Sequence, residues 1–327
     1  MQSIEIALAS VRRESLACLP TPLATLHNLG RLWNHEEIYI KRDDLTGLGP
    51  GGNKLRSLEF IAGEAIAQNA DTLVAAGPLQ SNLCTLTAAT CAKLGLKCIL
   101  IHNGERPEHP VGNLLLNRLL GAESIYLGNV TSKQREDALE EVIQRISLDR
   151  HPYAVRNGAT TGCGALGYTN AILELKEQAE QRNLSNMTIF APGGNGGVAT
   201  GLIYGNALCG FPFKVVIISV EDSAPVLKEN ICRTIKEVES ILHLPFPCPL
   251  EDACIIDDSY RGAGWGSNTE LSSQAISAFA QAEGILIENI YNSKVLVGMQ
   301  DYLRNDRVQG PVCYLHTGGF GSLFAQY

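Results

Sequence analysis

Short apolar runs rich in β-branched residues alternate along the chain with longer segments whose apolar residues recur at helical spacing. The short runs predict β-strands at residues 37–41, 72–76, 97–102, 187–191, 215–220 and 312–316. Helix-length segments separate these strands, and that alternation is typical of parallel sheets covered by helices on both faces. The pattern therefore predicts an α/β protein.

The connecting segments differ in character. Residues 132–146 and 169–182 place charged residues between apolar ones, which predicts amphipathic helices at the surface. Residues 103–112 are rich in Pro, Gly and charge, and residues 156–167 are rich in Gly and Thr. Each of these two segments is predicted to be a loop or a crossing between domains.

Composition and charge mainly exclude classes of protein and kinds of site. The 327-residue chain is 45% hydrophobic and 18% charged, as is typical of a folded globular protein. Its net charge of -8 and its lack of basic runs argue against nucleic-acid binding. Its ten cysteines include no C-x-x-C pair, so we expect buried thiols and no metal site. The N-terminal segment lacks a long apolar core and no stretch is long enough to span a bilayer, so we expect a cytoplasmic protein without membrane contact.

Lys54 is the first candidate for chemistry. It lies in the segment G-G-N-K-L-R at residues 51–56, where Asn53 is a suitable helix N-cap and the helix is predicted to run to about residue 68. A cation in the first turn opposes the helix macrodipole, so we expect the pKa of Lys54 to be lowered. A lysine of lowered pKa suits Schiff-base chemistry with an aldehyde, whereas a solvated surface lysine is the alternative.

Two further polar clusters follow predicted strands. In residues 77–82, backbone N–H groups, the Ser81 hydroxyl and the Asn82 amide suit a carboxylate or phenolate oxygen, although helix capping alone explains them equally well. The glycine-rich loop 193–201 suits a phosphate at a helix N-terminus. It is also a loose dinucleotide fingerprint with Glu221 at the position of a ribose-binding acid, which leaves an NAD(P)-dependent oxidoreductase as an alternative.

The last clusters lie near the C-terminus. The Thr317 hydroxyl, after the final predicted strand, can hydrogen-bond a ring nitrogen, whereas a simple strand-end turn is the alternative. Tyr291 precedes a predicted helix and can act as an acid or base, although half-buried packing is the commoner role. His102 and His109 have no third ligand in reach, and the absence of a G-x-S-x-G elbow argues against a serine hydrolase.

These motifs occur in an order that resembles the D-cysteine desulfhydrase / 1-aminocyclopropane-1-carboxylate (ACC) deaminase family of fold-type II pyridoxal 5′-phosphate (PLP) enzymes. The resemblance covers nearly the whole chain: L-P-T-P-L at 19–23, K-R-D-D at 41–44, G-G-N-K-L-R at 51–56, Q-S-N at 80–82, G-A-L-G-Y at 164–168, E-G-I-L at 283–286 and H-T-G-G at 316–319. It implies a tryptophan synthase β-like fold with two open, twisted, mostly parallel sheets flanked by helices. It further implies a large PLP-binding domain (residues 1–56 and 159–327), a small domain (57–158) and a homodimer.

The resemblance also assigns roles to residues. Lys54 would carry PLP, Asn82 would bond its 3′-oxygen, and Thr317 and Asn292 would lie near its pyridine nitrogen. The other cofactor-binding residues would be Asn53 and, around the phosphate, Gly194, Asn195, Gly196, Gly197, Val198 and Thr200. The substrate-binding residues would be Gln80, Ser81, Asn82, Leu83, Trp265 and Tyr291, with Ser81 and Tyr291 joining Lys54 in catalysis.

Departures from the family pattern at five positions bear on function. Leu83 stands where His or Gln is typical, Trp265 where a tyrosine is usual, and Asn195 and Val198 replace hydroxyl residues of the phosphate loop. Asn292 stands where ACC deaminases carry Glu, which argues against opening of the ACC ring. The expected activity is that of a PLP-dependent lyase converting D-cysteine to pyruvate, hydrogen sulfide and ammonia. The alternatives are ACC deaminase, a lyase for L-cysteate or another β-substituted alanine, a PLP-binding protein without lyase activity, and the oxidoreductase.

Overall fold

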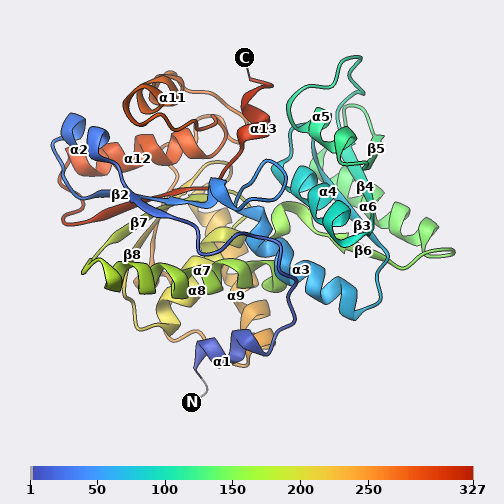
Figure 1. Ribbon diagram of the computed structural model, residues 1–327, viewed down its shortest axis with the longest axis horizontal. Helices are drawn as coiled ribbons and strands as arrows, with labels where there is room; N and C mark the ends of the chain where they lie inside the picture. The colour runs from blue at the N-terminus through green and yellow to red at the C-terminus, as the bar shows by residue number, and fades with distance from the viewer. Residues whose placement is uncertain (1–2, 327) are drawn as a thin grey trace.

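The computed structural model describes residues 3–326 and contains two β-sheets that lie side by side (Figure 1). The larger sheet has the strand order β1-β2-β10-β7-β8-β9 and is parallel except for the antiparallel pair β1–β2. The smaller sheet, β5-β4-β3-β6, is wholly parallel. The α/β fold with two mostly parallel sheets is therefore confirmed. The strands are β1 (Leu23–Thr25), β2 (Ile38–Arg42), β3 (Thr72–Pro78), β4 (Lys97–Asn103), β5 (Glu123–Tyr126), β6 (Pro152–Val155), β7 (Thr188–Gly193), β8 (Lys214–Ser219), β9 (Ile255–Asp257) and β10 (Val312–His316).

Helices cover both faces of the larger sheet. α7 packs against α3, α8 and α9 on one face, while α2, α11 and α12 pack together on the other. The helices are α1 (Ile4–Ala9), α2 (His27–Trp33), α3 (Lys54–Ala67), α4 (Asn82–Leu94), α5 (Gly112–Leu119), α6 (Ser132–Ile146), α7 (Gly162–Gln181), α8 (Gly197–Leu208), α9 (Ala224–Leu242), α10 (Leu250–Ala253), α11 (Glu270–Glu283), α12 (Asn292–Arg304) and α13 (Phe320–Leu323). The layered arrangement leaves the strand ends free to carry a site.

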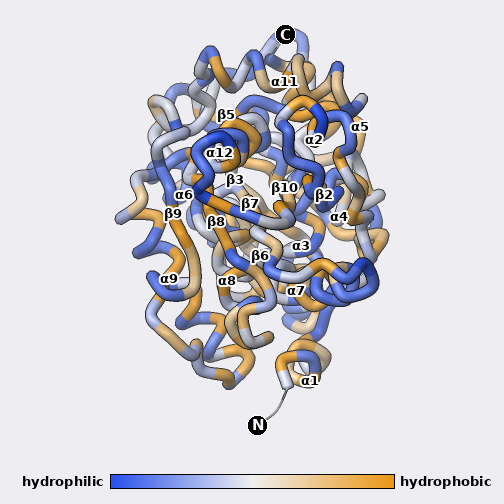
Figure 2. The backbone as a smooth tube through the Cα atoms, turned by 90° about the vertical axis from the view of Figure 1, so that its left-hand side faces the viewer, coloured by the Kyte–Doolittle hydropathy of each residue, from blue (hydrophilic) through white to orange (hydrophobic). Residues whose placement is uncertain are grey.

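The central strands are buried on both faces, which explains their continuous apolar runs. On β7, Ile189 joins the core under α7 and α8, whereas its neighbour Phe190 joins the core under α12. Because side chains alternate along a strand, neighbouring residues serve opposite layers. Figure 2 shows the contrast with α9, whose tube alternates between hydrophilic and hydrophobic colours along its length.

The predicted loop at residues 156–167 is wrong over its second half, because α7 begins at Gly162. The glycines there serve close packing between segments. A Cβ on Gly164 would lie 2.1 Å from the carbonyl oxygen of Ala159, and one on Gly167 would lie 2.4 Å from the carbonyl carbon of Arg56. Helix α7 therefore requires glycine at these two positions in order to approach its neighbours.

The two helices predicted to lie at the surface have different outcomes. α6 is amphipathic, with its apolar side on the smaller sheet, as predicted. The segment 169–182 is amphipathic and partly exposed, as predicted, but it is only the second part of the longer α7, whose preceding turns are buried. The charged residues in the final turns of α7 produced the amphipathic pattern, while the buried first turns pack against neighbouring helices. Within residues 3–326, no helix combines the length and the apolar character needed to cross a membrane.

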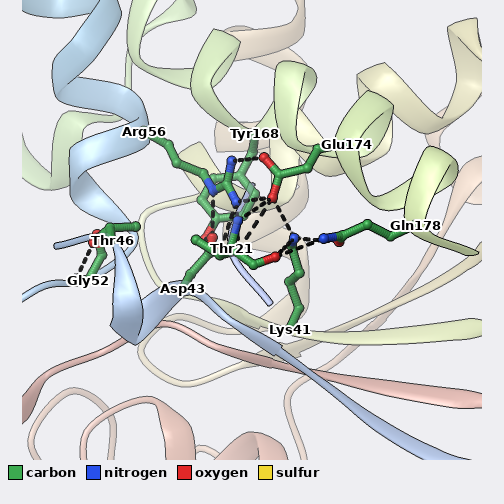
Figure 3. Close-up of polar contacts among 9 residues, drawn as sticks. All are labelled: Thr21, Lys41, Asp43, Thr46, Gly52, Arg56, Tyr168, Glu174 and Gln178. Carbon is green, nitrogen blue, oxygen red and sulfur yellow. Dashed lines mark hydrogen bonds and ion pairs between the residues drawn. The ribbon is translucent and has the colours of Figure 1, made fainter. Parts of the chain in front are cut away.

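A buried ion network joins the large sheet to α3 and α7 (Figure 3). Arg56 donates to both carboxylate oxygens of Asp43, at 2.7 and 2.8 Å, and to both oxygens of Glu174, at 2.9 Å each. Lys41 also donates to Glu174, and the Tyr168 hydroxyl donates to Asp43 at 2.6 Å. The side chain of Arg56 is only 1% exposed. Apart from Glu174, these partners come from K-R-D-D, G-G-N-K-L-R and G-A-L-G-Y, so three of the sequence motifs meet in a structural contact.

Candidate active site

A cleft lies where the carboxyl ends of strands from both sheets converge. The lining residues that bear on its chemistry follow strands of both sheets or lie at the start of the helices after them. Asn53 and Lys54 follow β2, Gly158 and Thr160 follow β6, and Arg135 lies in α6 after β5. Asn103 ends β4, Tyr291 immediately precedes α12, and the others follow β3, β7, β8, β9 and β10. They include Asn53, Lys54, Gln80, Ser81, Asn82, Leu83, Asn103, Arg135, Gly158, Thr160, Gly194, Asn195, Gly196, Gly197, Val198, Glu221, Trp265, Tyr291 and Thr317. Fourteen of these nineteen residues are the cofactor- or substrate-site candidates that the family resemblance implied, and Glu221 is the acid of the oxidoreductase alternative. Of the remaining candidates, Thr200 and Asn292 are buried outside the lining of the cleft.

Lys54 is the first residue of α3, as predicted, and its amine points across the cleft. Its Nζ donates a hydrogen bond to the carbonyl oxygen of Gly158 at 2.6 Å. Burial lowers the pKa of Lys54 to about 8, and the negative charge of Glu221 raises it in part. The predicted direction is confirmed, but the cause is removal of the amine from water rather than the helix dipole. The amine is therefore partly neutral near pH 7.

The turn before Lys54 is held by two contacts. Gly52 donates its N–H to the Thr46 hydroxyl at 2.8 Å, and the N–H of Asn53 donates to the Thr317 carbonyl at 3.0 Å. Gly52 adopts φ +133°, and its Cα would lie 2.6 Å from a Cβ on Gly318. The predicted glycine turn therefore serves close approach of two loops. Asn53 occupies the predicted N-cap position, but its side chain makes no capping hydrogen bond.

The polar cluster after β3 lies at the N-terminus of α4. The Ser81 hydroxyl accepts a hydrogen bond from the N–H of Cys84 at 3.3 Å, so it caps the helix while its own proton stays available to a ligand. Asn113 orients two neighbours: its side chain donates to Asn82 Oδ1 at 2.8 Å, and its N–H donates to Gln80 Oε1 at 2.8 Å. Asn113 was not predicted, because only the folded chain brings α5 to this edge.

The glycine-rich loop joins β7 to the N-terminus of α8. Gly196 adopts φ +106° at the N-cap position, a backbone conformation that favours glycine. The first N–H groups of α8 have no carbonyl partner within the helix, and the loop leaves this end open to the cleft. Thr200 lies one turn further in, where its hydroxyl is buried and makes no hydrogen bond within residues 3–326. The helix end suits a phosphate.

Thr317 is held in place by Asn292, which does not itself line the cleft. Asn292 Oδ1 accepts from the N–H of Thr317 at 3.0 Å and from its hydroxyl at 3.3 Å. Asn292 in turn donates to the carboxylate of Glu288 at 2.8 Å. Glu288 is buried, and it accepts from the backbone N–H groups that begin α12. The arrangement fixes a neutral hydroxyl at the cleft with a carboxylate behind it.

Tyr291 and Trp265 form a polar pair at the cleft wall. Trp265 donates its indole N–H to the Tyr291 hydroxyl at 2.8 Å. Burial raises the pKa of Tyr291, so the phenol keeps its proton at neutral pH and can donate it. Glu221 also lines this side of the cleft, and burial raises the pKa of its carboxyl group. The sequence indicated only a ribose-binding acid at Glu221, because no sequence pattern shows that this residue lines the same cleft as Lys54.

The residues present fit PLP. The cofactor needs an amine for its aldehyde, donors for its phosphate and a partner for its ring nitrogen. Lys54 supplies an amine of lowered pKa, the α8 N-terminus supplies N–H groups, and Thr317 supplies a hydroxyl. All three line one cleft. The fold and this cleft define an α/β enzyme with a lysine placed for Schiff-base chemistry beside an anion-binding helix end.

Comparisons with known proteins give the family. A family model described as a pyridoxal-phosphate dependent enzyme matches residues 14–318, so the chain belongs to that family and is a PLP-dependent enzyme. It is 35% identical over 325 residues to a D-cysteine desulfhydrase of Klebsiella pneumoniae, covering 96% of each chain. It is 32% identical over 339 residues to a D-cysteine desulfhydrase of Serratia proteamaculans, covering 99% of each.

Solved structures confirm the fold-type II architecture. A crystal structure described as an ACC deaminase homologue has a TM-score of 0.91 and 30% identity, covering 99% of this chain and 97% of its own. The processed form of a threonine deaminase from Solanum lycopersicum shares the fold with a TM-score of 0.67 at 14% identity, covering 96% of this chain and 88% of its own. The family replaces the NAD(P)-dependent alternative that the glycine loop left open.

Glu221→Gln is expected to shift the pH dependence of PLP attachment to the apoenzyme. Only the neutral amine attacks an aldehyde, and at a pKa near 8 about one tenth of Lys54 is neutral at pH 7. Glu221 raises that pKa, so its neutralisation lowers the pKa further. The pH at which the rate of PLP attachment is half-maximal, followed by visible absorbance, should move to a lower value. Glu229→Gln, on the exposed side of α9, should leave it unchanged, and an upward shift for Glu221→Gln would contradict the assignment.

Proposed function

We propose that this enzyme is a D-cysteine desulfhydrase, which converts D-cysteine and water to pyruvate, hydrogen sulfide and ammonia. One observation carries the proposal: a lysine of lowered pKa and the N-terminus of α4 line one cleft in a chain related over nearly its full length to proteins of that name. The reaction removes an α-proton and a β-substituent from a small amino acid, and the cleft offers an amine and a phenol for those two tasks.

The cofactor roles follow from position. We assign the PLP phosphate to the backbone N–H groups of residues 194–198 at the start of α8, because Asn195 and Val198 bring no hydroxyl there. Asn82 is assigned to the cofactor 3′-oxygen, and Asn113 supports this by orienting the Asn82 amide. Thr317 is assigned to the ring nitrogen, with Asn292 as a positioning residue behind it.

Lys54 is assigned to proton transfer at the substrate Cα. When bound, PLP supplies the electron sink that makes this proton acidic. Lys54 Nζ, once released, takes the proton because its lowered pKa leaves the amine neutral in a useful fraction. The Gly158 carbonyl, which accepts from Nζ, orients the amine across the cleft. Ser81 and Gln80 are assigned to the substrate carboxylate at the α4 N-terminus.

Tyr291 is assigned as the proton donor to the departing sulfur. Its buried phenol stays protonated, and Trp265 fixes its oxygen by donating to it, so the O–H remains directed elsewhere. Leu83 is 3% exposed and presents an apolar side chain to the cleft, which limits water near the reacting atoms. These features favour a substrate with a small, soft leaving group.

ACC deaminase is the second candidate, because a structural neighbour is described as an ACC deaminase homologue. Thr317 and Asn292 place a neutral hydroxyl, rather than a carboxylate, at the position assigned to the ring nitrogen. A neutral partner favours protonation of that nitrogen less than an acid does. For this reason we rank D-cysteine above ACC.

The domain organisation and assembly are part of the proposal. We place a large PLP-binding domain at residues 1–56 and 159–327 and a small domain at 57–158, supported by the separate six-stranded and four-stranded sheets. We also propose a homodimer, supported by the family resemblance, and a cytoplasmic location. The latter is supported by all ten cysteines, none of which is paired in a disulfide.

The test is a product assay on the purified holoenzyme. D-cysteine, L-cysteine, L-cysteate and ACC would each be supplied, and keto acid, ammonia and sulfide measured. Pyruvate and sulfide in equal amounts from D-cysteine support the proposal. Keto acid from ACC alone would select the deaminase, and lysine-bound PLP absorbance without any keto acid would leave a PLP-binding protein without lyase activity.

A further inference from the structure

We propose that Lys294 positions Tyr291, the assigned proton donor, by holding the segment 261–265 at the wall of the cleft. Lys294 lies in the first turn of α12, three residues after Tyr291, and the cleft lining within residues 3–326 does not include it. The inference rests on the proposed function, in which Tyr291 gives its proton to the departing sulfur. It adds a positioning residue that acts through the segment carrying Trp265.

The ammonium group of Lys294 is buried among backbone carbonyl groups. The residue is 1% exposed, and its Nζ donates to the carbonyl oxygens of Arg261 at 2.7 Å, Gly264 at 2.9 Å and Val220 at 3.2 Å. An ammonium has three N–H donors and no acceptor, so these contacts use all of its hydrogen-bonding capacity. A charge can be buried when its donors are paired in this way. The side chain therefore holds three peptide groups together.

Carboxylates do not explain the position of Lys294. Burial lowers the pKa of its amine, and the charges of Glu288 and Glu221 offset this in part without a hydrogen bond. A cation in the first turn of α12 is also opposed by the helix macrodipole. Since neither an ion pair nor helix stability accounts for a lysine here, the three carbonyl groups are the partners that do.

Two of these carbonyl groups precede residues of the cleft wall. The Val220 carbonyl belongs to the peptide bond with Glu221, and the Gly264 carbonyl belongs to the peptide bond with Trp265. Because a peptide group is planar, a contact that fixes its carbonyl also fixes the direction in which the next residue follows. Lys294 thus orients the backbone at two residues that line the cleft.

The segment that carries Trp265 has weak support of its own. Between β9, which ends at Asp257, and α11, which begins at Glu270, the chain forms no helix or strand. The hydrogen bonds within residues 258–267 are 3.2–3.4 Å long, and Trp265 is 36% exposed. The contacts from Lys294 to this segment are shorter and carry a full charge, so they are the stronger ones.

Trp265 transmits this hold to Tyr291. Its indole N–H donates to the Tyr291 hydroxyl at 2.8 Å and occupies one acceptor position of that oxygen. Displacement of Trp265 would free the phenol to turn, so its proton would lose its direction. Lys54 is held separately, by the Gly158 carbonyl. Loss of Lys294 should therefore impair proton donation to the leaving group and spare removal of the α-proton.

Two substrates with different leaving groups separate these steps. In D-cysteine the C–S bond breaks with its electron pair on sulfur, which takes the proton of Tyr291. In 3-chloro-D-alanine the C–Cl bond breaks to give chloride, which needs no proton, and water releases pyruvate and ammonia in both cases. On holoenzyme, Lys294→Met should lower kcat for D-cysteine about 10- to 100-fold, with KM changed less than about threefold. Pyruvate release from 3-chloro-D-alanine should fall less than about threefold.

Two further readouts do not depend on that comparison. In a Tyr291→Phe enzyme, Lys294→Met should reduce D-cysteine turnover less than about twofold further, because the two residues act through one proton. In Trp33→Phe holoenzyme Trp265 is the sole tryptophan, and Lys294→Met should make its fluorescence more accessible to quenching by acrylamide. Lys236→Met, which removes an exposed lysine from α9, should change neither readout.

The outcomes distinguish positioning of Tyr291 from general structural support. Equal losses for the two substrates, multiplicative losses with Tyr291→Phe, or unchanged quenching of Trp265 would each overturn the inference. If Lys294→Met does not fold, Lys294→Gln, which keeps two N–H donors, replaces it in the same comparisons. A parent enzyme that releases no sulfide from D-cysteine would remove the proposed function, while the quenching comparison would still test whether Lys294 holds the segment.

Discussion

Lys54→Ala is expected to reduce keto acid release by about 10³-fold or more while the protein remains folded. The substitution removes the amine to which we assign cofactor attachment and transfer of the α-proton, and no other described lysine lines the cleft. The visible absorbance of lysine-bound PLP should disappear with it. Because Lys54 is partly exposed and makes one hydrogen bond, its loss should cost little stability.

The position of the attachment is open to direct measurement. Borohydride reduction of the holoenzyme, followed by peptide mass spectrometry, should locate the cofactor on Lys54. Lys93→Ala removes an exposed lysine from the last turn of α4 and should leave absorbance and activity unchanged. Retention of both signals by Lys54→Ala, or a label on another lysine, would contradict the assignment.

Strong local patterns in the sequence predicted the main strands. The run at 312–316 is β10 residue for residue, and 72–76 lies within β3, because both are continuous apolar segments buried on two faces. The short strands β1, β5, β6 and β9 escaped notice, since three or four residues carry too little periodicity. Glycine misled the prediction at residues 162–167, where it marks close helix packing rather than a loop.

The residues of the site also divide into those that the sequence indicated and those that it did not. Lys54 and the glycine loop stand out because their chemistry is local: a cation in a helix's first turn and a glycine-rich helix end. The carbonyl of Gly158 and the amide of Asn113 have no such signal. They act on groups 104 and 33 residues away, respectively, and only the meeting of two sheets brings them there. The sequence therefore indicated the candidate reactive groups but not the groups that orient them.

The part played by Asn292 depends on its neighbours. The resemblance implies a position near the cofactor ring, and in the fold Asn292 lies behind Thr317 and donates to the Glu288 carboxylate. A substitution of Asn292 therefore acts on the assigned cofactor position only indirectly, because the side chain of Thr317 lies between them. Position 292 carries no Glu, but the acid Glu288 accepts hydrogen bonds from Asn292, so the electrostatics at Thr317 depend on both residues.

Arg56→Met is expected to destabilise the fold by about 3–5 kcal/mol, the largest effect on stability that we expect from a single substitution. Arg56 is 1% exposed and holds Asp43 and Glu174 by four hydrogen bonds. Without it, two carboxylates lie in the interior with only Lys41 as a cation nearby. Chemical denaturation at pH 7 measures the loss. Arg12→Met, which breaks an exposed pair with Glu14, should cost less than about 1 kcal/mol.

The pH dependence of that destabilisation distinguishes a lost ion network from lost packing. Arg56 contributes to lowering the pKa values of Asp43 and Glu174 in the folded state, below ordinary values of 3.8 and 4.5. Their contribution to stability is therefore complete above about pH 4.5 and is lost as the pH falls through the folded pKa values. Without Arg56, burial raises the pKa values of Asp43 and Glu174. In the variant these two groups therefore make no stabilising contribution that acid could remove. The difference in unfolding free energy between parent and Arg56→Met should narrow below pH 4. A constant difference in unfolding free energy down to pH 3 would mean that Arg56 stabilises the fold by packing alone. If the methionine variant does not fold, Arg56→Lys, which keeps the charge, provides the comparison.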